Sequence, residues 1–159
     1  CQRHYGCSQM TARDVCLSPA EWENALVQLQ LAKQLGIIDD ASPEALEARR
    51  QAKNAENARL QAAGTVFYGP QQYTPAMYLQ YELTRFKLDF AQPTAAIRAL
   101  PVCPVITEEQ KQAYYRNNPD LFTRYWGDSF PYEDVEQIIE KRLREEAYDA
   151  LVQDLLRQR

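Results

Sequence analysis

The sequence predicts an all-α protein, and three observations lead to that prediction. The 159 residues include only five glycines, and residues with high helix propensity dominate the chain. Four segments open with helix-start signals, at Ser18-Pro19, Ser42-Pro43, Thr74-Pro75 and Thr107. Apolar residues then recur at helical spacing. We therefore expect about five helices, with a long arm-like helix and a long C-terminal helix that closes an elongated helical domain.

The first two helices have clear ends. The first begins with a capping box at Ser18 and Glu21 and ends at Gly36. The second begins at Ser42 and is expected to reach Ala63. Its apolar stripe is mostly alanine and its charged residues are expected to face water, so we predict a partly exposed arm. The apolar stripe consists of Ala45, Leu46, Ala48, Ala52, Ala55, Leu60 and Ala62. The side expected to face solvent carries Arg49, Arg50, Lys53, Glu56 and Arg59.

The remaining elements follow the same signals. Residues 65–73 form a connector in which residues 66–68 could pair as a short strand. Residues 74–90 carry one apolar face, which favours a helix over a strand at 86–90. Prolines mark residues 91–105 as a linker with one helical turn near 95–100. A capped helix starts at Thr107, and the last helix starts at residue 131 or 132 with apolar residues every fourth position.

Length and composition suit one soluble domain. We divide it into an irregular, cysteine-rich segment at 1–17 and a helical domain at 18–159. The formal net charge of −4, without a clustered basic face, argues against a nucleic-acid partner. A cysteine in the first position is typical of a processed lipoprotein, and an arbitrary boundary of the chain is the alternative; the sequence leaves both open.

The cysteines are disulfide candidates if the chain is extracytoplasmic. Four of them allow three pairings, and the sequence does not choose among these. Free thiols and a zinc site that includes His4 remain alternatives. The disulfide candidates are Cys1, Cys7, Cys16 and Cys103.

Catalytic motifs are lacking. The chain has one histidine, no nucleophile with an adjacent base, no phosphate-binding glycine loop and no metalloprotease motif. Neighbouring acids such as Glu108 and Glu109 point in different directions on a helix. We therefore predict that the protein is not an enzyme and uses no cofactor and no metal.

Aromatic residues flank the 91–105 linker on both sides. Filling of the core is the alternative for most of them, but rings exposed in a cleft would bind apolar peptide segments. The predicted peptide-binding residues are Met77, Tyr78, Tyr81, Phe86, Tyr114, Tyr115, Tyr125 and Trp126.

Three segments resemble the helical domain of SurA/PrsA-type, trigger-factor-like chaperones that frame parvulin prolyl isomerases. Ala32 to Ile37 resembles that family's A-x-x-x-G-I helix end. Ile106 to Phe122 is similar to its I-T-x-E-E-x-x-x-Y-Y-x-x-N-x-x-x-F element, and the run from Phe130 to Leu156 resembles its returning helix. The parvulin domain itself is missing, because only residues 123–129 separate the last two elements. The short N-terminal segment is a second departure.

The resemblance implies a non-catalytic, extracytoplasmic chaperone of the cell envelope or secreted space, which binds unfolded or exported polypeptides. It also implies a bacterial source and a homodimer. A lipid anchor at Cys1 is a further expectation, which follows from the cysteine in the first position. A structural adaptor with one dedicated protein partner is the alternative function. Residual prolyl isomerase activity and a zinc module are weaker rivals.

Overall fold

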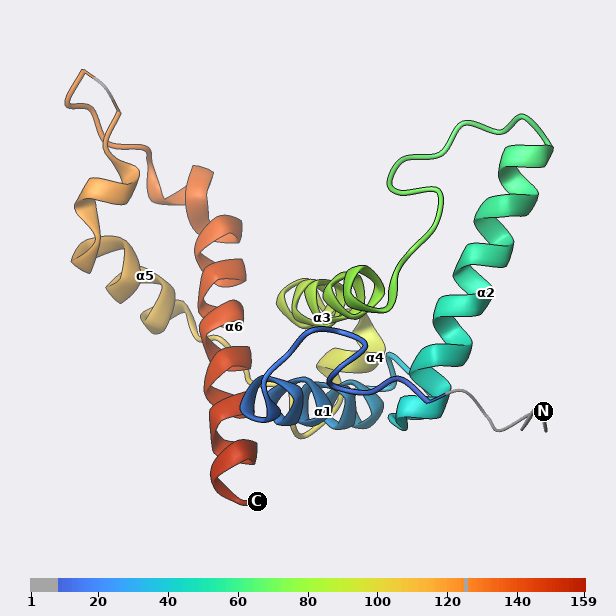
Figure 1. Ribbon diagram of the computed structural model, residues 1–159. Coiled ribbons are helices and arrows are strands. Elements are labelled where there is room, and N and C mark those ends of the chain that lie inside the picture. The colour runs from blue at the N-terminus through green and yellow to red at the C-terminus, as the bar shows by residue number, and fades with distance from the viewer. Residues whose placement is uncertain (1–8, 125) are drawn as a thin grey trace, which may run out of the picture. The chain divides into compact units, whose positions relative to one another are not determined.

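A computed structural model describes residues 9–124 and 126–159, and these residues confirm the all-α prediction (Figure 1). They form six α-helices and one 3-10 helix, η1, with no β-strand among them. The chain divides into two compact units, residues 1–86 and 87–159, which are described separately. The elements are α1 (Pro19–Gln34), α2 (Pro43–Ala62), α3 (Pro75–Ala91), α4 (Ala95–Arg98), α5 (Glu108–Asn117), η1 (Pro119–Phe122) and α6 (Tyr132–Arg157).

The predicted helix ends are confirmed by their capping geometry. The Ser18 hydroxyl accepts a hydrogen bond from the Glu21 backbone N–H at 3.2 Å, and the Glu21 carboxylate accepts one from the Ser18 N–H at 3.3 Å. The Ser42 hydroxyl accepts from the Ala45 N–H at 3.2 Å. These bonds satisfy donors that the first turn of a helix leaves free. Local sequence therefore sets where α1 and α2 begin.

In the first unit, α1 is the most enclosed helix. Its buried residues lie on opposite sides of the helix, at Ala25 and Leu29 on one side and Val27 and Leu31 on the other. A helix that buries apolar residues all round belongs to the interior of a fold. Leu46 of α2 and Leu79 and Phe86 of α3 are also buried in this unit.

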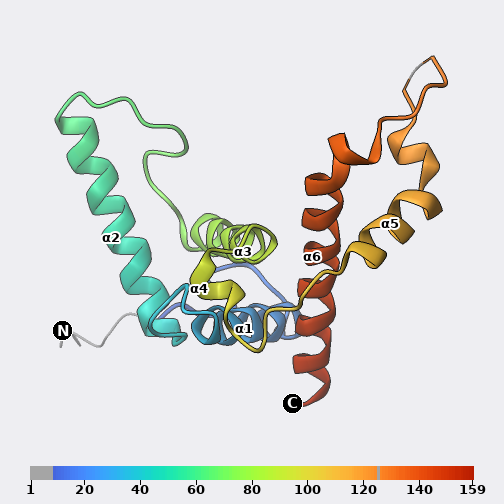
Figure 2. The same ribbon diagram turned by 180° about the vertical axis from the view of Figure 1, so that it is seen from behind.

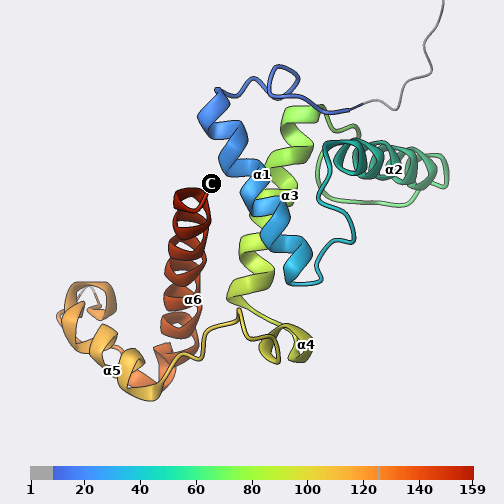
Figure 3. The same cartoon turned by 90° about the horizontal axis from the view of Figure 1, so that it is seen from below.

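The predicted orientation of α2 is wrong. Its alanine stripe is largely exposed, whereas the buried residues of the helix are Leu46, Glu47 and Asn57. The partly buried Arg50 and Asn54 lie at helical spacing between them. The inward face is therefore mostly polar, and the loop that follows α2 supplies its partners (Figures 1 and 3). The alanine stripe does not face the interior because burial of an alanine side chain removes little apolar area from water and therefore stabilises the fold little.

The second unit is built around α5 and α6, which lie side by side (Figures 1 and 2). Phe122, Val135 and Ile139 form its buried cluster, and Tyr114, Tyr115, Tyr132 and Leu143 pack against them. Phe90, in the last turns of α3, meets Tyr148 of α6 with ring centroids 5.4 Å apart. The aromatic content of the sequence therefore serves largely as core here, which was the alternative to peptide binding.

Two local details differ from the sequence-based expectations. Residues 66–68 form no strand and belong to an irregular loop. Residues 119–122 form the short 3-10 helix η1, which was not among the elements expected from the sequence. Beyond it, Thr123 and Ser129 make an isolated antiparallel bridge, which closes the turn before α6.

Candidate functional site

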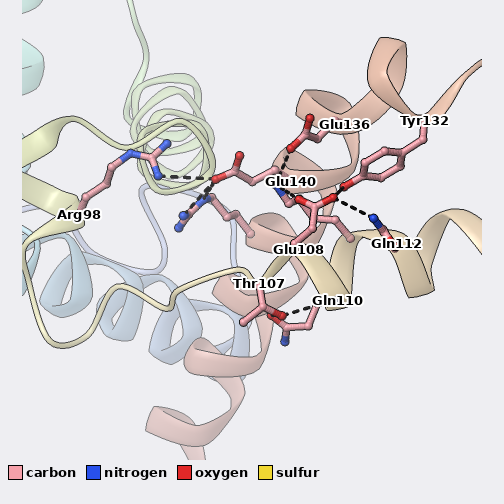
Figure 4. A network of polar contacts seen from close by, with 10 residues as sticks. Arg98, Thr107, Glu108, Gln110, Gln112, Tyr132, Glu136 and Glu140 are labelled. Atoms are coloured by element: carbon pink, nitrogen blue, oxygen red, sulfur yellow. Dashed lines mark hydrogen bonds and ion pairs between the residues drawn. The ribbon is translucent and has the colours of Figure 1, made fainter.

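A polar network joins α5 to α6 in the second unit (Figure 4). The Lys111 ammonium donates to the Glu136 carboxylate at 2.7 Å and lies 3.2 Å from the Glu108 carboxylate. The Tyr132 hydroxyl donates to Glu108 at 2.5 Å. One lysine on α5 thus links a carboxylate of each helix, and a tyrosine at the start of α6 completes the group.

The electrostatics of this group fix its charges near neutral pH. The hydrogen bond from Tyr132, followed by that from Lys111, lowers the pKa of Glu108. The hydrogen bond to Glu136 is the main cause of a raised pKa at Lys111. Burial, then the bond to Glu108, raises the pKa of Tyr132 to about 12. Glu108 stays anionic, Lys111 cationic and Tyr132 neutral, so the group orders two helices and does not exchange protons.

The same face of the unit holds a second charged group around Glu140. The Glu140 carboxylate lies 3.5 Å from the Arg98 guanidinium and 3.2 Å from that of Arg144. The buried Arg144 also donates to the Pro104 carbonyl at 3.1 Å, so it ties the linker to α6. Glu140 and Arg98 border a pocket of about 300 Å³. Its other lining residues are Ala91, Gln92, Pro93, Gln137 and Lys141.

That pocket can hydrogen-bond a small polar molecule, but it offers no catalytic pair. Its one carboxylate, Glu140, lies between the guanidinium groups of Arg98 and Arg144. A site in which a carboxyl group donates a proton to its substrate needs a carboxyl whose pKa is raised. Asp14, Asp40 and Glu108 shift the other way, because hydrogen bonds to their charged forms lower each pKa.

The buried carboxylates of the first unit are also paired. Glu82 on α3 accepts two hydrogen bonds from Arg49 of α2, at 2.7 and 2.9 Å. Glu47 accepts from Arg50 at 2.5 and 2.9 Å. A two-point contact between a guanidinium and a carboxylate is strong and fixes the orientation of both groups. These pairs are therefore structural contacts between neighbouring segments.

The structure distributes the predicted peptide-binding residues over two clusters, one in each unit. Tyr78 and Tyr81 pack with Tyr73 in the first unit. Tyr114 and Tyr115 pack on Phe122 in the second. The others differ in exposure: Phe86 is fully buried, Met77 and Trp126 are exposed, and Tyr125 lies outside the described residues.

The cysteine predictions are tested only in part. Cys16 is an exposed free thiol and Cys103 a buried one, while Cys1, His4 and Cys7 lie outside the described residues. Over residues 9–124 and 126–159, no three His, Cys, Asp or Glu side chains are grouped to hold a metal ion. In the same part of the chain, no helix is long and apolar enough to cross a membrane. The disulfides, the lipid anchor, the homodimer, the lack of a nucleic-acid partner and the extracytoplasmic location stay predictions.

Comparison with known proteins points to an enzyme. The sequence matches no protein-family model and no curated protein. Two solved structures are similar, those of the native protein and of the selenomethionine derivative of the GH136 lacto-N-biosidase from Eubacterium ramulus. Each matches over 86% of this chain with 30% sequence identity and a TM-score of 0.71. The chain spans 28% of the length of that enzyme.

These matches overturn three predictions. The neighbour is a glycoside hydrolase, so the predicted functions, a non-catalytic chaperone or an adaptor, are wrong. The predicted peptide binding and the prediction that the protein is not an enzyme are wrong for the same reason. A lack of local catalytic motifs does not exclude a relation to an enzyme. The chain matches only 28% of the length of the hydrolase, and no residue pattern in the sequence pointed to this similarity. The resemblance to SurA/PrsA-type proteins stays a prediction.

Proposed function

We propose that this chain is the α-helical part of a GH136-type glycoside hydrolase, whose assembly releases lacto-N-biosyl units from glycans. One observation carries the proposal: 86% of the chain matches a lacto-N-biosidase with 30% identity and a TM-score of 0.71. The match includes both sequence and fold, so it supports more than a shared arrangement of helices.

The proposal assigns the chemistry to other parts of the enzyme. Glycoside hydrolysis generally uses two carboxyl groups, one of which is protonated when it meets the leaving group. In this chain, Glu47, Glu82 and Glu140 are bound to arginines, and Glu108 has a lowered pKa. We infer that the catalytic pair belongs to the larger share of the hydrolase, beyond the 28% that this chain matches.

The test uses the protein as its source cells make it. An affinity tag on this chain would recover it together with whatever polypeptide accompanies it, and p-nitrophenyl lacto-N-bioside would report hydrolysis. We expect release of nitrophenol, with p-nitrophenyl galactoside as the control substrate that is left intact. A preparation that contains this chain and its companions but shows no turnover above the blank would overturn the proposal.

A variant pair checks that the activity depends on this chain. Ile139→Ala removes part of the buried cluster of the second unit, whereas Ile138→Ala changes the exposed neighbour on the same helix. We expect the first to shorten the half-life of the activity at elevated temperature and the second to leave it unchanged. Equal half-lives would mean that the hydrolase does not need this fold.

A further inference from the structure

The loop between α2 and α3 is anchored by side chains of α2. Asn54 brackets one residue of the loop: its amide donates to the Tyr73 carbonyl at 3.0 Å and accepts from the Tyr73 N–H at 2.6 Å. The Arg50 guanidinium donates to the same carbonyl at 3.0 Å. The buried Asn57 amide donates to the Pro70 carbonyl at 3.2 Å. Three side chains at helical spacing thus hold one side of the loop.

Aromatic packing fixes the end of the loop that enters α3. The Tyr73 ring lies 5.7 Å from that of Tyr78 and 5.4 Å from that of Tyr81, measured between centroids. The Lys53 ammonium lies 5.7 Å from the centre of the Tyr81 ring, within the range of a cation–π contact. The loop is therefore tied to α2 by hydrogen bonds and to α3 by edge-to-face and tilted ring contacts.

The outer part of this anchored loop presents apolar side chains to solvent. Val66 is 85% exposed and Tyr68 is 98% exposed. Holding a loop in place costs about 1–2 kcal/mol per ordered residue, and a buried amide such as Asn57 is tolerated only when it is hydrogen-bonded. A loop that only connects two helices would need neither a fixed conformation nor a buried amide that holds it. Fixing a surface before it meets its partner reduces the cost of binding, so the arrangement suits an interface.

We propose that residues 64–72 are a docking loop, on which Val66 and Tyr68 pack into an apolar part of the remaining GH136-type hydrolase. This inference rests on the proposed function. The matched lacto-N-biosidase supplies the occupant, because this chain corresponds to 28% of it and the larger part of such an enzyme must adjoin the helical part.

The chemistry of the loop favours a protein surface over a sugar. Tyrosine is enriched among residues that dominate the energetics of protein interfaces. Val66 has no hydrogen-bonding side-chain group, so it could not satisfy sugar hydroxyls, but it can fill an apolar depression on a protein. An aliphatic and an aromatic side chain two residues apart therefore fit a protein partner.

Photo-crosslinking of the native assembly tests the docking loop. A p-benzoylphenylalanine residue replaces Tyr68 in the tagged chain, and a matched preparation carries it in place of Val105, which is 82% exposed in the other unit. We expect position 68 to give at least about tenfold more crosslinked product than position 105. A hot-spot side chain is buried against the partner in the assembly, so the crosslinker at position 68 would touch the partner. Mass spectrometry of the product should identify a peptide of the hydrolase outside residues 1–159. Equal yields at the two positions would overturn the inference.

Two further arms separate the explanations. Asn57→Ala removes the buried anchor. We expect this variant to lower the crosslink yield at position 68 several-fold while circular dichroism shows unchanged helix content. An unchanged yield would contradict the anchoring argument.

Tyr68→Ala should leave KM for the nitrophenyl substrate unchanged. A raised KM without any crosslink would make the loop a sugar contact. Turnover without a crosslink overturns the docking loop alone. A crosslink to a polypeptide without hydrolytic activity overturns the proposed function.

Discussion

The two units use the same kinds of polar residue in different surroundings. In the first unit, Glu82 and Glu47 are buried carboxylates, each bound to an arginine of α2. In the second unit, the pairs of Lys111 with Glu136 and of Lys87 with Asp149 have exposed carboxylates. Only Arg144 is a buried charge among the described residues of the second unit.

The number of ion pairs in a unit therefore says little about how much each pair stabilises the fold. A pair in water contributes about 0–1 kcal/mol, because both charges are well solvated when apart. Breaking a buried pair by removing one partner costs several times more, because the other charge stays in the interior without compensation. The first unit should therefore be sensitive to loss of single polar groups, and the second to loss of apolar volume.

The largest effect is expected at the buried carboxylate of α3. Glu82→Gln leaves the Arg49 guanidinium without its counter-ion, and we expect a loss of about 3–4 kcal/mol in the free energy of unfolding. Arg49 is partly exposed, so water limits the loss. Urea unfolding monitored by circular dichroism measures the change.

The matched control for that variant is Glu136→Gln in the second unit. Glu136 binds Lys111 at 2.7 Å, as short as the bond between Arg49 and Glu82, but it is far more exposed. We expect a loss below about 1 kcal/mol. Similar losses for the two variants would show that burial does not separate the two units.

A smaller loss is expected from apolar truncation in the second unit. Ile139→Ala should lower the free energy of unfolding by about 2–3 kcal/mol, because Ile139 packs in the buried cluster with Phe122 and Val135. Ile138→Ala should change it by less than about 0.5 kcal/mol, since Ile138 is 62% exposed. Equal effects in urea unfolding would mean that this cluster is not a core.

The smallest effect is on the titration of Glu108. The Tyr132 hydroxyl lowers the pKa of this carboxyl, so its contribution to stability is present above the pKa of the unfolded chain and is lost as the pH falls through the folded value. Tyr132→Phe removes the hydrogen bond, and we expect the pKa of Glu108 to rise toward its ordinary value. Carbon-detected NMR titration of the Glu108 carboxyl measures it, and an unchanged pKa would assign the shift to Lys111.

Local signals in the sequence predicted the helices well. Ser18, Ser42, Thr74 and Thr107 each precede a helix, because a side-chain oxygen at that position satisfies backbone donors of the first turn. The 3-10 helix η1 was not predicted. The Asn-Asn-Pro run at 117–119 indicates the end of a helix but not the conformation that follows it.

Packing and function depended on contacts that no local pattern encodes. The inward face of α2 was predicted on the wrong side, because Arg50, Asn54 and Asn57 find their partners in a loop as far away as Tyr73. The burial of Glu82 likewise depends on an arginine 33 positions earlier. The polar pocket beside Glu140 joins residues of α3, α4 and α6, and its composition gives no catalytic motif. The similarity to a glycoside hydrolase emerged from comparison of the whole chain, in which 30% of the residues are identical and the TM-score is 0.71.

The backbone at Gly64 has a consequence for chemical synthesis of the chain. Its φ of +72° is a conformation that L-residues rarely adopt, and the space where a Cβ would stand is open to 4 Å. An amino acid of the opposite handedness prefers that conformation. Ligation of a segment with D-alanine at position 64 would therefore restrict the denatured chain without crowding the native one, and the melting temperature should rise.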